Sequence, residues 1–230
     1  MMKVKSPGLQ FYVDKLRNNE PFSFVRYGDG EFDCILKLGR TMGARNQHCL
    51  PDLVLALKES LTEKRAGAYY HAMNPDFMGR ISALPKIEAW LASNAPTLDW
   101  HQCTIFYKAS LKGRLFPLVQ AMEERRVVVV GPPWLNKLPF ASEFVPVRTH
   151  DCWKDVNSIV AQLRNLKNAV VSFSAGPTTK VLIHRLQPLI GKHSWLIDCG
   201  SVWDIYCGVK SRSYHGRVTP AIQRKNLTGK

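Results

Sequence analysis

Apolar residues along the chain fall into short runs rich in β-branched and aromatic side chains, separated by longer segments with helical spacing. The runs predict strands at roughly 22–27, 67–71, 104–108, 127–131, 169–174 and 195–198. The intervening segments predict helices near 8–18, 31–39, 52–64, 112–125, 152–167 and 178–189. Uninterrupted apolar strands such as VVVVG are typical of parallel sheets that are covered on both faces. We therefore expect an α/β, Rossmann-like fold, with a mostly parallel sheet and helices on both faces.

The length and composition are consistent with one α/β domain. With 230 residues, 45% of them hydrophobic, the chain can bury one large core, which we place at 1–208. The segment 209–230 is polar and basic, and we expect a loosely held tail there. No apolar run reaches the roughly 18 residues that cross a bilayer, and the start lacks the apolar part of a signal peptide. A soluble, cytoplasmic protein is the expectation.

The six cysteines are scattered and show no zinc-ligand spacing. In a cytoplasmic protein such cysteines are expected to be reduced thiols, partly buried in the core.

Positive charge is concentrated in the last third of the chain. The net charge is +14, and beyond Asp155 there are eleven Lys and Arg residues against two Asp residues, an excess of nine positive charges. Such a surface favours a polyanion, whether nucleic acid, anionic lipid headgroups or a phosphorylated acceptor. The alternative is a solvated basic face that serves solubility alone.

The segment FSFVRYGDGEFDCILKL joins an apolar strand to an amphipathic helix through a glycine-flanked acidic loop. Gly28 and Gly30 let the backbone turn sharply, which brings the carboxylates of Asp29 and Glu31 towards one point. Mg²⁺ and Mn²⁺ take one or two carboxylates and complete their shell with water and substrate phosphates. Arg26 at the strand end can contact a phosphate or hold a carboxylate. The alternative is that Asp29 caps the helix and Glu31 stabilises its positive end.

A second strand–turn–helix junction lies in AVVSFSAGPTTKVLIHRL. Gly176 supplies the turn, and Pro177 suits the first helical position. The amides and hydroxyls of Thr178 and Thr179, together with Lys180, can receive a phosphate or a sugar hydroxyl. The alternative is an ordinary α/β turn.

A third segment, WLIDCGSVWDIYCG, places Asp198 at a strand end and Asp204 six residues later. Either carboxylate can act as the general base for an acceptor hydroxyl or as a further metal ligand. Both can instead be counter-ions in the most basic part of the chain.

Upstream, VVVVGPPWLNKLPF carries Trp134 and Phe140, which either line a ligand pocket or pack in the core.

Taken in this order, the three segments resemble glycosyltransferases of the GT-D fold. That family has an R-x-G-D-G-E segment carrying a D-x-E metal motif, a G-P-T-[AT]-x-V-L helix start, and a late strand ending in D-x-G that is soon followed by another acid. The matching residues are Arg26, Gly28, Asp29, Gly30 and Glu31; Gly176, Pro177, Thr178, Thr179, Val181 and Leu182; and Asp198, Gly200 and Asp204. The resemblance covers the first 40 residues and roughly 169–208, whereas 40–165 match only in their rhythm of strands and helices.

The resemblance implies a nucleotide-sugar donor, a UDP-sugar in particular, and Mn²⁺ or Mg²⁺ held by Asp29 and Glu31. It leaves the acceptor open. Known relatives mostly decorate glycans, and the basic C-terminal third departs from them. This departure favours a nucleic-acid acceptor, such as a hydroxymethylated base in the duplex DNA of some phages. The alternatives are a bacterial surface glycan or lipid-linked sugar as acceptor, or a non-catalytic nucleic-acid-binding protein.

Overall fold

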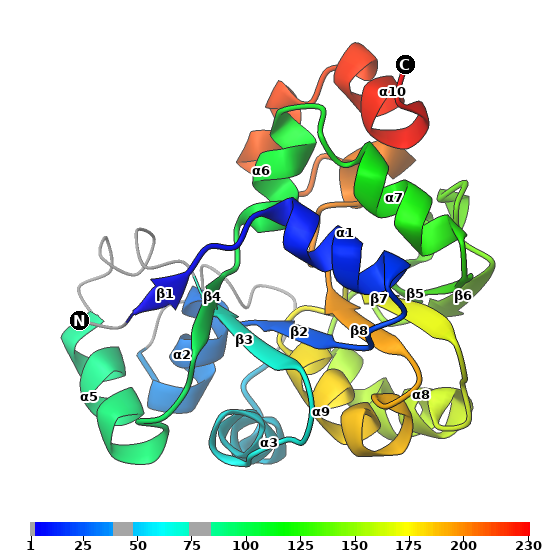
Figure 1. Ribbon diagram of the computed structural model, residues 1–230. Coiled ribbons are helices and arrows are strands. Elements are labelled where there is room, and N and C mark those ends of the chain that lie inside the picture. Colours follow the sequence, from blue (N-terminus) through cyan, green and yellow to red (C-terminus); the bar gives the residue numbers. More distant parts are fainter. Residues whose placement is uncertain (1–2, 39–47, 74–83) are drawn as a thin grey trace.

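Eight parallel strands form one sheet in the computed structural model, which describes residues 3–38, 48–73 and 84–230 (Figure 1). The strand order is β1–β4–β3–β2–β8–β7–β5–β6, and every neighbouring pair is parallel. The strands are β1 (Val4–Lys5), β2 (Ser23–Arg26), β3 (Tyr69–Met73), β4 (Trp100–Gln102), β5 (Arg126–Gly131), β6 (Glu143–Pro146), β7 (Ala169–Phe173) and β8 (Trp195–Asp198). The predicted α/β fold with a parallel sheet is confirmed.

Helices cover both faces of this sheet (Figure 1). One face packs against α1 (Leu9–Arg17), α6 (Ile105–Leu111) and α7 (Phe116–Glu123). The other face packs against α2 (Asp29–Leu36), α3 (Pro51–Thr62), α5 (Leu84–Asn94), α8 (Val156–Leu163) and α9 (Thr178–Ile190). The described ranges also contain the short 3₁₀ helices η1 (Pro133–Lys137), η2 (Cys152–Asp155), η3 (Asp204–Cys207) and η4 (Ser213–Arg217). The last helix, α10 (Pro220–Thr228), packs on α6 and α7.

Strand β5 explains why the strands read as uninterrupted apolar runs. Val128 and Val130 belong to the core under one face of the sheet, and Val127 and Val129 belong to the core under the other. Because side chains alternate between the faces of a strand, a strand covered on both sides needs apolar residues at every position. All four valines are fully buried.

The predicted strand at 104–108 is wrong, because this segment forms the start of helix α6. Its β-branched and aromatic residues suggested a strand, but Ile105, Phe106 and Ala109 are buried at positions that one helix face brings together. The strand that pairs in the sheet is β4, which is three residues long and precedes the predicted run. The short strands β1 and β6, the helix α5 and the helix α10 were not predicted either.

The segment 209–230 differs from the expected loose tail. It contains η4 and α10, and both are anchored by fully buried polar residues, His215 and Asn226. The Asn226 side chain accepts a hydrogen bond from Leu115 N and donates to Ser110 O, both at 2.8 Å. The sequence reads as a tail because these anchors are polar, so the segment lacks the apolar stripe of an ordinary amphipathic helix.

Two of the six cysteines differ from the expected reduced state. Cys34 at the end of α2 and Cys49 before α3 form a disulfide. The other four, Cys103, Cys152, Cys199 and Cys207, are free and buried, as predicted. The part of the chain that the structure describes contains no helix both long and apolar enough to span a membrane.

Candidate functional site

The site lies at the carboxyl ends of β2 and β8, which are neighbours in the middle of the sheet. The chain leaves β2 into α2 on one face, and it leaves β8 towards η3 on the other face. Because the two connections diverge, a crevice is expected where the strands end, and ligands of open α/β sheets bind at such points. Helix α9, which follows β7, contacts both β2 and β8 on the face of the sheet that also carries α2. All three segments singled out in the sequence therefore contribute to this edge.

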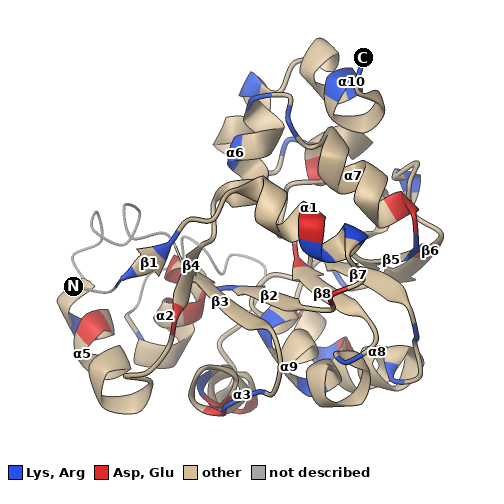
Figure 2. Cartoon of the chain, viewed as in Figure 1, with Lys and Arg blue, Asp and Glu red and all other residues tan. Residues whose placement is uncertain are grey.

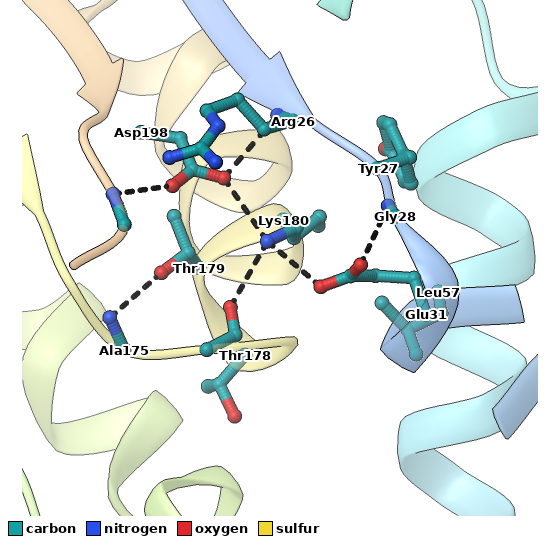
Figure 3. A network of polar contacts seen from close by, with 12 residues as sticks. Arg26, Tyr27, Gly28, Glu31, Leu57, Ala175, Thr178, Thr179, Lys180 and Asp198 are labelled. Carbon is teal, nitrogen blue, oxygen red and sulfur yellow. Dashed lines mark hydrogen bonds and ion pairs between the residues drawn. The ribbon is translucent and has the colours of Figure 1, made fainter. Parts of the chain in front are cut away.

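Lys180 of α9 joins the first and third of these segments (Figure 3). Its buried ammonium Nζ lies 2.8 Å from Glu31 Oε1 and 3.0 Å from Asp198 Oδ2, and it also donates to Gly176 O at 3.2 Å. The three charged side chains are almost completely buried. They form one ion cluster that ties α2, α9 and the end of β8 together.

The pKa values of Glu31 and Lys180 favour their charged forms. Burial would raise the pKa of Glu31, but the charge and hydrogen bond of Lys180 outweigh it and hold the pKa below its usual value. Burial would lower the pKa of Lys180, but Asp198 and Glu31 outweigh it and raise the pKa. At neutral pH the carboxylate and the ammonium are therefore both ionised.

Arg26 completes the cluster from the end of β2. Its backbone N donates to Asp198 Oδ2 at 3.2 Å, and its Nη1 donates to Cys199 O at 3.0 Å. Its Nε is buried and has no hydrogen-bond partner among the described residues. Gly200 makes this placement possible, because a Cβ there would collide with the guanidinium and its φ of 54° is strained for other residues.

Asp198 is held on both oxygens, and this bears on its predicted role as a base. Oδ2 accepts from Arg26 N and Lys180 Nζ, while Oδ1 accepts from Gly200 N at 3.0 Å. Taking a proton from a substrate would disrupt these contacts. Asp198 therefore acts in the structure as an anchor for the loop, for the backbone at the end of β2 and for the Lys180 ammonium.

Asp204 lies on η3, and its contacts differ from those of the ion cluster. Oδ1 accepts from Trp134 Nε1 at 2.9 Å, and Oδ2 accepts from the Ser211 hydroxyl. Asp204 is buried, and its two oxygens fasten η3 to η1 on one side and to the segment that follows η3 on the other. Of the two aromatic residues upstream, Trp134 makes this contact, and Phe140 packs on Trp203 with ring centroids 4.9 Å apart.

Asp29, the first residue of α2, is the partly exposed acid at this edge. Burial and the neighbouring charge of Glu31 raise its pKa, and backbone hydrogen bonds at Gly30 and Asp29, followed by the positive charge of Arg212, oppose them. Within the cluster, Glu31 and Asp198 are balanced by Lys180 and Arg26, whereas the Asp29 carboxylate forms no ion pair with any of the described residues. An added cation is the natural complement of such a charge.

The predicted anion site at the start of α9 is largely used within the protein. Thr179 Oγ1 accepts from Ala175 N at 2.9 Å, and Thr178 Oγ1 accepts from Cys152 Sγ at 3.0 Å. The amide of Thr179 donates to Gly176 O and the amide of Lys180 donates to Pro177 O, at 3.1 and 3.2 Å. Both threonines are fully buried, so their hydroxyls brace the turn and do not face a ligand. Gly176 forms the turn at a φ of 56°, which favours glycine.

Two residues at this edge, Arg212 and Tyr214, were missed by the sequence analysis because they lie in the supposed tail. Tyr214 Oη lies 3.2 Å from Ser201 Oγ, in the loop after β8, and its ring lies 5.0 Å from the ring of Tyr107. Arg212 is exposed and acts electrostatically on Asp29. The Arg-Ser-Tyr-His run inside a polar segment was the available signal, since an aromatic residue and a histidine are unusual in a free tail.

A divalent cation is compatible with the carboxylates of this site. The described ranges contain no cluster of three or more His, Cys, Asp or Glu side chains suited to a metal. Magnesium-type sites need only one or two carboxylates when substrate phosphates complete the shell. Asp29 is open to such a cation. Glu31 uses Oε1 for Lys180 and Oε2 for Gly28 N at 2.8 Å, which leaves about half of a carboxylate's four acceptor positions.

Solved structures of DUF1792 domains (domain of unknown function 1792) share this fold. A selenomethionine-substituted DUF1792 domain has a TM-score of 0.63 and 19% identity, over 88% of this chain and 80% of that chain. A DUF1792 structure from Streptococcus sanguinis, described as a new glycosyltransferase, has a TM-score of 0.67 and 18% identity, over 89% and 84% of the two chains. A third, described as a DUF1792 domain with a distinct glycosyltransferase fold, has a TM-score of 0.64 and 18% identity, over 97% and 90%.

These similarities define the class of fold. The chain has the α/β architecture of the DUF1792 structures along nearly its whole length. No protein-family model matches the chain, and no curated protein matches it in sequence.

Proposed function

We propose that the protein is a glycosyltransferase that transfers a sugar from a nucleotide-sugar donor to a hydroxyl group. The observation that supports this most is the placement of the open Asp29 carboxylate beside a balanced, buried ion cluster at the switch point of the sheet. The proteins of this fold that are described as glycosyltransferases support the same reaction class.

We propose further that Mn²⁺ or Mg²⁺ is the cofactor, with Asp29 as its open ligand and Glu31 as the second carboxylate. When bound, the cation neutralises the charge that develops on the leaving diphosphate. Asp29 supplies a negative charge that no described residue pairs with directly, and Lys180 fixes the position of Glu31. Arg26, whose Nε has no hydrogen-bond partner among the described residues, is a donor that the site offers to a phosphate oxygen.

The donor and the acceptor are proposed from different grounds. A UDP-sugar follows from the resemblance to GT-D enzymes. A hydroxymethylated base in DNA follows from the net charge of +14, which suits a polyanionic acceptor better than a neutral glycan. A bacterial surface glycan or a lipid-linked sugar is the alternative acceptor for the same chemistry.

Nucleotide release from a panel of nucleotide-sugars tests the proposal. Each donor is incubated with the protein in Mn²⁺, in Mg²⁺ and in chelator. We expect metal-dependent nucleotide release from one donor. The Asp29→Asn variant should release nucleotide at least about a hundredfold more slowly. Asp52→Asn is the matched control, because Asp52 is an exposed acid at the start of another helix, α3.

The opposite outcome is equally informative. If no donor binds and none is hydrolysed, while Asp29→Asn and Glu31→Gln leave nucleic-acid binding intact, the chain is a non-catalytic nucleic-acid-binding protein on the same scaffold.

A further inference from the structure

Two distant parts of the sequence that contain no acidic residue come together in one lobe of the structure. Residues 100–122 and 205–230 contain no Asp or Glu. The first range forms β4, α6 and most of α7, and the second forms most of η3 with η4 and α10. We call α6, the α6–α7 turn and residues 208–230 the basic lobe. Its cations are Lys108, Lys112, Arg114, Lys210, Arg212, Arg217, Arg224, Lys225 and Lys230.

Specific contacts hold the two parts of the basic lobe together. Asn226 of α10 bonds to Leu115 N and Ser110 O, and its Nδ2 also donates to Tyr206 Oη at 2.8 Å. Tyr206 Oη in turn lies 2.7 Å from the Ser110 hydroxyl. Because these contacts are buried or partly buried, the lobe is a fixed surface on which the positions of the charges are set.

The charges of the basic lobe face solvent and are not neutralised locally. All nine cations are exposed, and none of them forms an ion pair with an acid in the described ranges. Figure 2 shows blue segments on α6, on α10 and on the chain between them, whereas the acidic segments lie mainly on other elements. A cluster of like charges destabilises the folded chain through repulsion, so a partner that neutralises it would be bound favourably.

The basic lobe adjoins the site at the carboxyl edge of the sheet. Helix α6 begins directly after the carboxyl end of β4. The Tyr107 ring of α6 contacts Tyr214, which reaches Ser201 in the loop after Asp198. Ser211 of the lobe is fastened to Asp204. A large ligand lying on the lobe would therefore extend to the edge where Asp29 is partly exposed.

The lobe lacks the features of a surface that inserts into lipid. The exposed large hydrophobic residues of the described chain are Leu50, Leu55 and Leu189, and all three lie outside the lobe. Membrane-surface helices combine basic residues with an apolar face that enters the bilayer. A basic surface without exposed large hydrophobic residues is typical instead of contact with a phosphate backbone.

We propose that the basic lobe is the surface on which the sugar-phosphate backbone of double-stranded DNA docks, with the acceptor base presented to the carboxyl edge. The inference rests on the proposed transferase function, since that function gives the docked duplex its role. Phosphate contacts set the register and orientation of a duplex without reading its sequence, which suits an enzyme acting on a modified base at many positions.

A pair of matched triple variants tests the docking surface. Lys108→Glu, Lys112→Glu and Arg224→Glu reverse three charges of the basic lobe. The control reverses two Lys and one Arg at the opposite edge of the sheet, before β7 and β8: Lys167→Glu, Lys192→Glu and Arg164→Glu. All six residues are exposed, and the net charge changes equally. The probe is a fluorescent DNA duplex of unmodified sequence, titrated at several salt concentrations.

We expect the lobe variant to bind the duplex at least about tenfold more weakly, with a salt slope smaller by about one for each phosphate contact removed. The control should bind nearly as the unaltered protein does. Thermal unfolding establishes that both variants are folded, and Gln replaces Glu at the same positions if charge reversal prevents folding.

Equal weakening by the lobe variant and the control would overturn the inference, because it would mean that only net charge matters. It would also be overturned if the unaltered protein bound phosphatidylserine vesicles and not the duplex. Nucleotide release without DNA reports the proposed function separately. Nucleotide release without duplex binding would rule out only the proposed docking surface. Duplex binding through the lobe without release from any donor would rule out only the proposed transferase function.

Discussion

The ammonium of Lys180 lies 2.8 Å from Glu31 Oε1, so the second carboxylate of the D-x-E motif is paired within the protein itself. The same ammonium contacts Asp198 at 3.0 Å. One lysine on α9 thereby positions acidic residues from the end of β8 and the start of α2. The two acids of the motif consequently differ in kind: Glu31 is buried and neutralised, whereas Asp29 is partly exposed and is not.

Replacing Lys180 with Met should be strongly destabilising. It leaves two buried carboxylates without their cation, and breaking a buried ion pair by removing one partner costs about 3–5 kcal/mol. The measurement is the free energy of unfolding in urea, with Lys192→Met at an exposed position as the control. In a double-mutant cycle, Lys180→Met with Glu31→Gln should cost less than the sum of the single changes. Additive losses would mean that the pair is not coupled.

The stability of the protein should fall in acid because of Glu31. Its pKa is lowered in the folded state from the ordinary value of 4.5, so the folded protein binds the proton less readily than the unfolded chain. Glu31 makes its full contribution to stability when the pH is above 4.5. This contribution is lost as the pH falls below 4.5 and passes the lower pKa of the folded state. Unfolding free energies between pH 3 and 7 should decline more steeply in acid for the unaltered protein than for Glu31→Gln. Parallel curves would contradict the assignment.

The sequence predicted those parts of the fold that rest on a continuous pattern. Strands with apolar residues on both faces, such as the four valines of β5, can be recognised because burial on both sides leaves no polar position. The residue types of 104–108 predict a strand, whereas the burial of this segment follows a helix. The loop with Asp29 and Glu31 was located from its glycines. The role of Lys180 was not predicted, because its partners lie 149 and 18 residues away in the sequence and only the pairing of β2 with β8 brings them together.

Gly200→Ala should cost more stability than Gly208→Ala. Both glycines have positive φ, of 54° and 82°, so either change strains the backbone by about 1–2 kcal/mol. The space around a Cβ at 208 is open, but at 200 the Cβ meets the Arg26 guanidinium. Overpacking of this kind typically adds about 1–3 kcal/mol. Urea unfolding of the two variants measures the difference, and equal losses would show that Arg26 moves aside without cost.

Asn226→Ala tests whether the C-terminal segment is part of the folded domain. The change leaves Leu115 N and Ser110 O without their partners, and each buried unsatisfied group costs about 1–3 kcal/mol. Asn165→Ala, at an exposed position, is the control and should change stability by less than about 0.5 kcal/mol. If both variants unfold at the same urea concentration as the unaltered protein, the segment behaves as a tail after all.

The two acids of the D-x-E motif should have opposite effects on stability. The pKa of Asp29 is raised by burial and by Glu31, so its ionised form is disfavoured in the folded state, and this cost is present at neutral pH. Asp29→Asn removes the cost and should leave the melting temperature unchanged or higher, even though nucleotide release is lost. Glu31→Gln removes a carboxylate that Lys180 stabilises and should lower the melting temperature. Sites that bind charged ligands commonly carry such a stability cost, which the ligand relieves.

Thermal unfolding at pH 7, with and without Mn²⁺, makes the comparison: Mn²⁺ should raise the melting temperature of the unaltered protein but not that of Asp29→Asn. A lower melting temperature for Asp29→Asn without metal would instead indicate that Asp29 is a structural helix cap.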